Sequence, residues 1–92
     1  MRREEVPAGA PVVTEGEDGD RFYVVLSGML AASQESRGPQ SVLRPGDYFG
    51  EVALAMNVPR TASVRALTPA TVASCDRATF DEFIRPLFAE SS

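Results

Sequence analysis

Apolar residues occur in short runs, and glycine or proline interrupts these runs about every ten residues, a spacing typical of proteins built from many short strands. Several runs are rich in β-branched and aromatic residues, which favour extended structure. Strands are expected at residues 11–14, 22–26, 29–34, 41–44, 63–67 and 70–75. Polar loops containing glycine or proline separate them. The pattern therefore predicts a small antiparallel β-roll.

The pattern changes to a helical one at Asp76, a residue well suited to cap a helix N-terminus. Apolar residues then recur with the spacing of one helical face. They are Phe80, Phe83, Ile84, Leu87 and Phe88, and we expect most of them to lie in the core. Pro86 lacks a backbone N–H, so we expect it to split this segment into a short helix and the start of another.

The expected fold class is mainly β with flanking helices. A jelly-roll-like, antiparallel β-roll occupies about residues 6–75, with one short helix inside it, and a C-terminal helical segment occupies about residues 76–92. A chain of 92 residues supports one modest core, so residues 1–92 are expected to form a single domain.

Composition excludes several functions. The net charge is −4 and all nine basic residues are arginine, which argues against direct binding of nucleic acid. The chain has no histidine, so imidazole-based metal sites and acid–base chemistry are not expected, and neither is an enzyme. No apolar run is long enough to span a membrane. The single cysteine, Cys75, is compatible with a reducing compartment, and the expected location is the cytoplasm, or the cytoplasmic portion of a larger protein.

The most informative segment is residues 50–62, which begins with a short predicted helix. Gly50 permits a sharp entry and a close approach of the backbone. The amides of Val52 and Ala53 have no intrahelical acceptor and can bind an anion. Glu51 is suited to accept a hydrogen bond from a sugar hydroxyl, although a surface acid at a helix N-terminus would be stabilising by itself.

The second half of this segment contains one arginine among small residues. Pro59 is expected to end the helix and to place Arg60 predictably. Most arginines are simply solvated, but Thr61 and Ala62 are small enough to let the backbone lie close to a ligand. A guanidinium beside free amides suits a single phosphate next to a ribose.

These residues resemble a known family. Residues 49–54 together with 59–64 are similar to the phosphate-binding cassette of cyclic nucleotide-binding domains. Further matching positions lie upstream in residues 15–28 and downstream as far as Phe80, and the resemblance covers about residues 8–88. It is to the regulatory domains of cAMP- and cGMP-dependent protein kinases. It implies that the ligand is cAMP or cGMP and that no other cofactor is bound.

The resemblance also implies residue roles. Arg60 pairs with the exocyclic phosphate oxygens, and Glu51 holds the ribose 2′-hydroxyl. The amides of Ala53 and Ala62 support the phosphate, and Asp20 helps to hold Arg60 in place. Thr61 gives a slight preference for cGMP, because its hydroxyl can bond the guanine edge.

The implied function is a regulatory module. Ligand binding moves the C-terminal helices and so controls a fused or partner effector such as a protein kinase. Two alternatives remain open: the sensor half of a cyclic-nucleotide-responsive transcription regulator, and a degenerate β-roll used for protein docking. The family closes its site with a longer C-terminal helix, so we expect a truncated lid in a chain that ends at Ser92.

Overall fold

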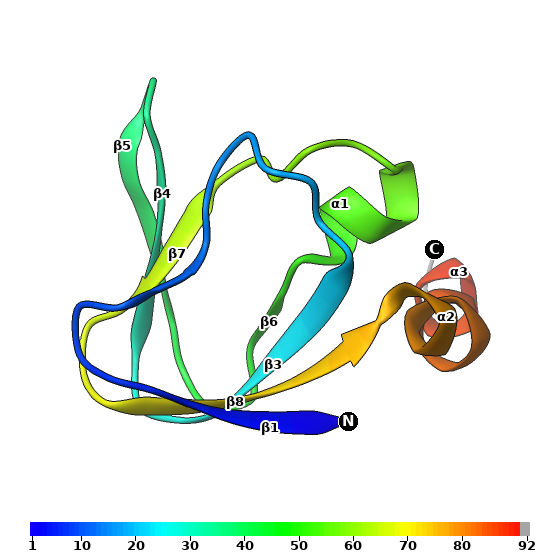
Figure 1. Cartoon of the computed structure of the whole chain (residues 1–92). Helices are drawn as coiled ribbons and strands as arrows, with labels where there is room; N and C mark the ends of the chain where they lie inside the picture. Colours follow the sequence, from blue (N-terminus) through cyan, green and yellow to red (C-terminus); the bar gives the residue numbers. More distant parts are fainter. Residues whose placement is uncertain (91–92) are drawn as a thin grey trace.

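The computed structural model describes residues 1–90, and within this range the side chains of residues 40, 55 and 88–90 are left undescribed. Two four-stranded antiparallel sheets form the β-roll, and the helices lie together at one end of it (Figure 1). The first sheet has the order β1 (Arg2–Val6), β8 (Ala70–Asp76), β3 (Arg21–Ser27) and β6 (Tyr48–Phe49). The second has the order β2 (Pro11–Val13), β7 (Ser63–Ala66), β4 (Leu30–Gln34) and β5 (Gly38–Leu43). The predicted antiparallel β-roll is confirmed.

Two strands were not predicted. Strand β1 is four-fifths charged and carries no apolar alternation, yet it pairs with β8 along its whole length, from Arg2 opposite Ser74 to Val6 opposite Ala70. Strand β6 has only two residues, Tyr48 and Phe49, and pairs with the middle of β3. The roll therefore begins at Arg2 and not near residue 6, because backbone pairing with β8 outweighs the polar sequence.

The core consists of two clusters on opposite faces of the first sheet. Neighbouring side chains of a strand point to opposite faces, so Phe22 and Tyr23 of β3 enter different clusters. The cluster between the sheets contains Val6, Val13, Tyr23, Val25, Leu30, Phe49, Val64, Ala66, Ala70 and Val72. The cluster beneath the helices contains Phe22, Leu54, Cys75 and Phe80. This second cluster joins the roll to both helical regions.

Helix α1 (Glu51–Met56) connects β6 to β7, as predicted, but it ends for a different reason. Asn57 adopts a left-handed conformation (φ 54°) and its N–H bonds to the carbonyl of Ala53. A left-handed residue satisfies carbonyls at a helix C-terminus, and asparagine tolerates it better than most. The helix therefore stops before Pro59 is reached, and the prediction that Pro59 ends it is wrong.

The C-terminal segment begins where predicted. The Asp76 carboxylate accepts a bond of 2.9 Å from the amide of Thr79, and this capping bond lowers the pKa of Asp76. Three contiguous helical stretches follow: α2 (Arg77–Thr79), the π-helical turn η1 (Phe80–Ile84) and α3 (Arg85–Glu90). Pro86 does not separate them into two helices as predicted. It follows the π-turn directly, as the second residue of α3, and the helical run continues through it.

The π-turn also changes which residues are buried. The N–H of Arg85 bonds to the carbonyl of Phe80, five residues earlier, so later positions rotate relative to an α-helical stripe. Phe80 is fully buried, whereas Phe83 and Leu87 are 62% and 60% exposed. The expectation that the stripe is mostly core is therefore wrong for Phe83 and Leu87. The side chain of Phe88 and residues 91–92 lie outside the described part of the chain.

Candidate functional site

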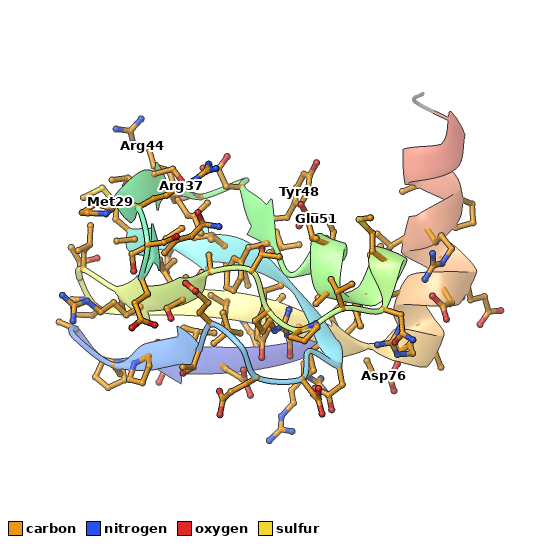
Figure 2. All side chains as sticks on the ribbon, turned by 90° about the horizontal axis from the view of Figure 1, so that it is seen from above. Met29, Arg37, Arg44, Tyr48, Glu51 and Asp76 are labelled. Carbon is orange, nitrogen blue, oxygen red and sulfur yellow. The ribbon has the colours of Figure 1, made fainter. Side chains whose placement is uncertain are left out.

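One cavity of about 210 Å³ lies between α1 and the second sheet. Its lining includes all seven residues predicted to bind the ligand, namely Gly50, Glu51, Val52, Ala53, Arg60, Thr61 and Ala62. The opposite wall is mainly apolar and includes Val13, Ala32, Leu43 and Val64. Glu51 lies next to Tyr48 at the start of α1 (Figure 2), and both line the cavity. The site thus combines one polar wall with one apolar wall.

Arg60 is the central residue of the polar wall. Only 7% of it is exposed, and its guanidinium donates to the carbonyl oxygens of Arg21 (2.9 Å) and Gly50 (3.4 Å). The guanidinium carbon lies 5.8 Å from the centre of the Tyr23 ring. Burial lowers the pKa of Arg60, although an arginine remains charged at any physiological pH. The two carbonyls fix the orientation of the guanidinium and leave other N–H groups for a ligand.

In the described part of the chain, no ion pair joins this buried charge to a carboxylate, although the nearby charges of Asp20 and Glu51 act on it. Among the described residues, the ion pairs join Arg2 to Glu4 and Arg85 to Asp81, and none involves Arg60. A buried cation without a counter-ion is costly, and a bound anion removes that cost. The electrostatics of the cavity therefore favour a negatively charged ligand.

Asp20, the predicted support for Arg60, has an exposed side chain. No hydrogen bond or ion pair joins it to Arg60 in the part of the chain that the structure describes. Its charge does act on Arg60, since it raises the pKa of the guanidinium against the effect of burial. The backbone carbonyls hold Arg60 in this structure, and a supporting role for Asp20 stays a prediction.

Two glycines allow the chain to pack around Arg60. A side chain at Gly19 would bring its Cβ within 2.7 Å of Arg60 Nε and 2.6 Å of the Ala53 Cβ. At Gly50, φ is +95° and a Cβ would lie 2.8 Å from Arg60 Nη1. Gly50 was predicted from the sequence as a binding residue, whereas Gly19 was noted only as part of an upstream similarity. A glycine between two acidic residues gives no signal that it contacts a distant arginine.

The loop between β2 and β3 fixes the main chain of Arg60. The amide of Arg60 donates to the carbonyl of Glu17 (2.8 Å), and the amide of Gly16 donates to the carbonyl of Arg60 (2.9 Å). This reciprocal pair resembles a short stretch of β-ladder. Both ends of the arginine, its backbone and its guanidinium, are therefore held by main-chain groups.

Backbone donors complete the polar wall. The amides of Val52 and Ala53 lie in the first turn of α1, where N–H groups have no intrahelical acceptor. The amide of Ala62 also has no acceptor among the described residues. Ala62 and the first turn of α1 lie on the same cavity as the Arg60 guanidinium. Together they form a set of donors suited to the oxygens of one phosphate.

The far end of α1 is bound to the C-terminal helical segment by two arginines that the sequence analysis did not identify. Arg77 and Arg85 both donate to the carbonyl of Leu54, at 3.1 Å and 3.0 Å. Arg77 also donates to the carbonyl of Gly19 (3.3 Å), and Arg85 pairs with Asp81 (2.8 Å). Cations at a helix C-terminus are stabilised by the helix dipole. Any displacement of α1 therefore acts directly on these two side chains.

Other chemistry is not supported by the described residues. They contain no group of three or more potential metal ligands, and no helix among them has the length and apolar character needed to cross a bilayer. Cys75 is a buried free cysteine, and burial raises the pKa of its thiol. It packs as a small apolar residue, in agreement with the sequence interpretation.

The fold is a β-roll, and the donors and charge of its cavity suit a small anion. The sequence model of the family described as "Cyclic nucleotide-binding domain" matches residues 3–86, so the chain belongs to this family. A regulatory subunit of cAMP-dependent protein kinase from Debaryomyces hansenii is 41% identical over 78 residues, which are 85% of this chain and 17% of that protein. The one from Yarrowia lipolytica is 42% identical over 83 residues, 89% of this chain and 22% of that protein.

Solved structures agree with this assignment. A structure described as cAMP-bound PfPKA-R has a TM-score of 0.91 and 31% identity, and it covers 98% of this chain and 32% of that one. The regulatory domain of Toxoplasma gondii PKA with cAMP has a TM-score of 0.87 and 34% identity, covering 98% of this chain and 38% of that one. The predicted resemblance to kinase regulatory domains is confirmed. The curated relatives are regulatory subunits by name, in agreement with the expectation that the domain is not an enzyme.

Proposed function

We propose that this domain binds cAMP through segment 50–62 and acts as a regulatory module. The observation that carries the proposal is the buried Arg60 guanidinium, which has no carboxylate partner among the described residues and lies beside unpaired amides. In the proposed complex Arg60 bonds to the exocyclic phosphate oxygens. The amides in the first turn of α1 and the amide of Ala62 donate to the same phosphate group. Glu51 accepts a bond from the ribose 2′-hydroxyl.

The apolar wall of the cavity is the proposed site of the base. Ala32, Leu43 and Val64 offer a surface on which a planar ring can lie. At about 210 Å³ the cavity is smaller than the roughly 300–1,000 Å³ typical of small-molecule sites. The phosphate and ribose are therefore proposed to fill it, while part of the base extends beyond its mouth.

The proposed ligand is cAMP and not cGMP. The matched curated relatives are named as cAMP-dependent, and the slight preference for cGMP inferred from Thr61 is not supported. Thr61 is exposed, so its hydroxyl competes with water for any contact with a base. Thr61→Ala is accordingly expected to leave the preference for cAMP over cGMP unchanged in a competition assay.

The proposed output is a movement of the C-terminal helical segment. Phosphate binding at the first turn of α1 biases the position of this helix. Because Arg77 and Arg85 donate to the carbonyl of Leu54 in its last turn, a shift of the helix also moves these two side chains. A ligand shifts such an equilibrium only through different affinities for the two states. The chain spans about a fifth of the curated relatives' length, so the effector is a proposal as well. We propose that it is the catalytic part of a protein kinase. The proposed location is the cytoplasm, where Cys75 stays reduced.

Titration calorimetry of the protein with cAMP and cGMP, side by side, tests the ligand assignment. We expect saturable binding of cAMP at one site per chain and weaker binding of cGMP. Absence of binding for both nucleotides would contradict the proposal and would favour a β-roll used for protein docking. Tighter binding of cGMP would contradict the choice of ligand alone.

A further inference from the structure

Tyr23, in the middle of β3, contacts both Arg60 and Phe49. The Arg60 guanidinium carbon lies over the Tyr23 ring, 5.8 Å from its centre. The Phe49 ring stacks on the Tyr23 ring, with 4.8 Å between the centres and 7° between the planes. Tyr23 and Phe49 lie directly opposite each other in the β3–β6 pair, so their side chains point to one face of the sheet. Strand pairing therefore fixes the ring that the guanidinium contacts.

The contact joins a buried cation to a buried ring, since Arg60 and Tyr23 are each 7% exposed. A cation within about 6 Å of a ring centre is attracted by the electron-rich face, and the attraction is strongest where water is excluded. Among the described residues no ion pair joins Arg60 to a carboxylate. The Tyr23 ring is therefore a source of electrostatic stabilisation for this charge before any ligand arrives.

The carbonyl bonds to the guanidinium leave it one freedom of movement. The carbonyl of Arg21 accepts from Nη2 at 2.9 Å and that of Gly50 accepts from Nη1 at 3.4 Å, longer than the roughly 2.7–3.2 Å of most such bonds. Two anchor points define a line, and a planar group can still tilt about that line. The contact with the Tyr23 ring opposes this tilt. Tyr23 does not line the cavity, so any effect that it has on a ligand passes through Arg60.

We propose that Tyr23 is a positioning residue, whose ring holds the Arg60 guanidinium by a cation–π contact in the orientation that receives the ligand phosphate. This inference rests on the proposed function, since it assigns a role within the same site. A guanidinium that samples other orientations is competent to bind for only part of the time, and the apparent affinity falls by that fraction. The ring keeps the competent fraction high.

The first test uses the ligand-free protein. Rotation of the guanidinium about its Nε–Cζ bond exchanges the two Nη groups, and NMR measures the rate of this exchange for Arg60. We expect rotation about 3–30-fold faster in Tyr23→Leu, the value of a desolvated cation–π contact, and close to the native rate in Tyr23→Phe, which keeps the ring. Val25→Ala is the matched control, because it removes volume from the same buried cluster at a residue that does not line the cavity.

The second test replaces Tyr23 with phenylalanine and with its mono-, di- and trifluorinated analogues. Fluorine withdraws electrons from the ring face while the shape stays nearly constant, so a variant that folds poorly is avoided. We expect cAMP affinity, measured by titration calorimetry, to fall stepwise along the series, by about 2–10-fold in all. A ring that serves only to fill the core predicts equal affinities throughout.

The inference is overturned if Tyr23→Leu rotates no faster than Val25→Ala, or if affinity is constant along the fluorinated series. An affinity that rises with fluorination would overturn it too, because the ring would then compete with the phosphate for the charge. If the unmodified protein binds no cAMP, the proposed function fails. The rotation rate in the ligand-free protein then decides by itself whether Tyr23 positions Arg60.

Discussion

The two ends of α1 are held in different ways. At its first turn, the neighbouring Arg60 is fixed by main-chain groups: the carbonyls of Arg21 and Gly50 accept from its guanidinium, and the carbonyl of Glu17 accepts from its amide. At its last turn, the C-terminal helical segment is held through the side chains of Arg77 and Arg85. Arginine side chains donate to carbonyls at both ends, but Arg60 is only 7% exposed and is also held through its own amide, whereas the Arg85 side chain is 42% exposed. An exposed side chain can exchange its partner for water at low cost.

Burial follows the same division. Arg60 and Ala53 are buried at the proposed anion site, while Phe83 and Leu87 of the C-terminal segment are more than half exposed. A region with few buried apolar contacts opens at a low free energy, which is a property required of a moving element. The comparison teaches that the recognition half of this domain is preorganised and that the responding half is lightly attached.

The largest expected effect on cAMP affinity is at Arg60, beside the first turn of α1. Arg60→Lys keeps the positive charge but loses the planar fork that reaches two carbonyls and a phosphate together. Removing one partner of a buried pair costs on the order of 3–5 kcal/mol, so cAMP binding should weaken by well over tenfold. Titration calorimetry measures this directly, and an unchanged dissociation constant would show that Arg60 is not the phosphate ligand.

The next effect concerns Gly19. Gly19→Ala places a methyl group within 2.7 Å of the Arg60 Nε and 2.6 Å of the Ala53 Cβ, so either the loop or the arginine must move. Overpacking of this kind costs about 1–3 kcal/mol, and we expect a lower free energy of unfolding together with weaker cAMP binding. Urea unfolding and calorimetry give the two values. Gly16→Ala in the same loop separates the two causes: its Cβ would have no neighbour within 4 Å but φ is +87°, so it should lower stability through backbone strain without displacing Arg60.

A smaller effect on cAMP affinity is expected at the last turn of α1, where Arg85 holds the C-terminal helical segment. Arg85→Met removes one of two arginines from the Leu54 carbonyl and breaks the ion pair with Asp81, both partly exposed. We expect cAMP affinity to change less than in Arg60→Lys, while amide exchange in residues 77–87 becomes faster both with and without ligand. Hydrogen-exchange mass spectrometry follows these peptides. Unaltered exchange there would mean that Arg85 does not hold the segment.

The smallest effect is a pH dependence at the start of the same segment. Hydrogen bonds from Thr79 lower the folded-state pKa of Asp76 below its ordinary value of 3.8. The stabilisation is therefore present above the unfolded pKa and is lost as pH falls through the folded pKa. The difference in melting temperature between the native protein and Asp76→Ala should be largest near pH 7 and shrink below about pH 4. A difference that is constant over this range would contradict the capping role.

The sequence was informative where local chemistry sets the structure. The strands follow from β-branched runs between turns, and the cap at Asp76 follows from its own side chain. The seven predicted binding residues lie within thirteen consecutive positions, and all of them line one cavity. Short separations of this kind constrain geometry strongly, so residue types and spacing were enough to predict which residues line this cavity.

Long-range contacts could not be read from a single sequence. Nothing near Arg77 or Arg85 indicates that both reach Leu54, which lies 23 and 31 residues away. Strand β1 carries no apolar pattern because its stabilisation comes from backbone pairing with β8. The π-turn before Pro86 depends on how the segment packs against the roll, so the exposure of Phe83 was missed. In each case tertiary packing, and not local preference, decided the outcome.

The most direct test of the central claim is a crystal structure of the protein with cAMP. The account predicts that exocyclic phosphate oxygens lie within about 3.2 Å of the Arg60 guanidinium and of at least one amide in the first turn of α1. A nucleotide bound at another surface, with Arg60 still bonded only to the carbonyls of Arg21 and Gly50, would contradict it.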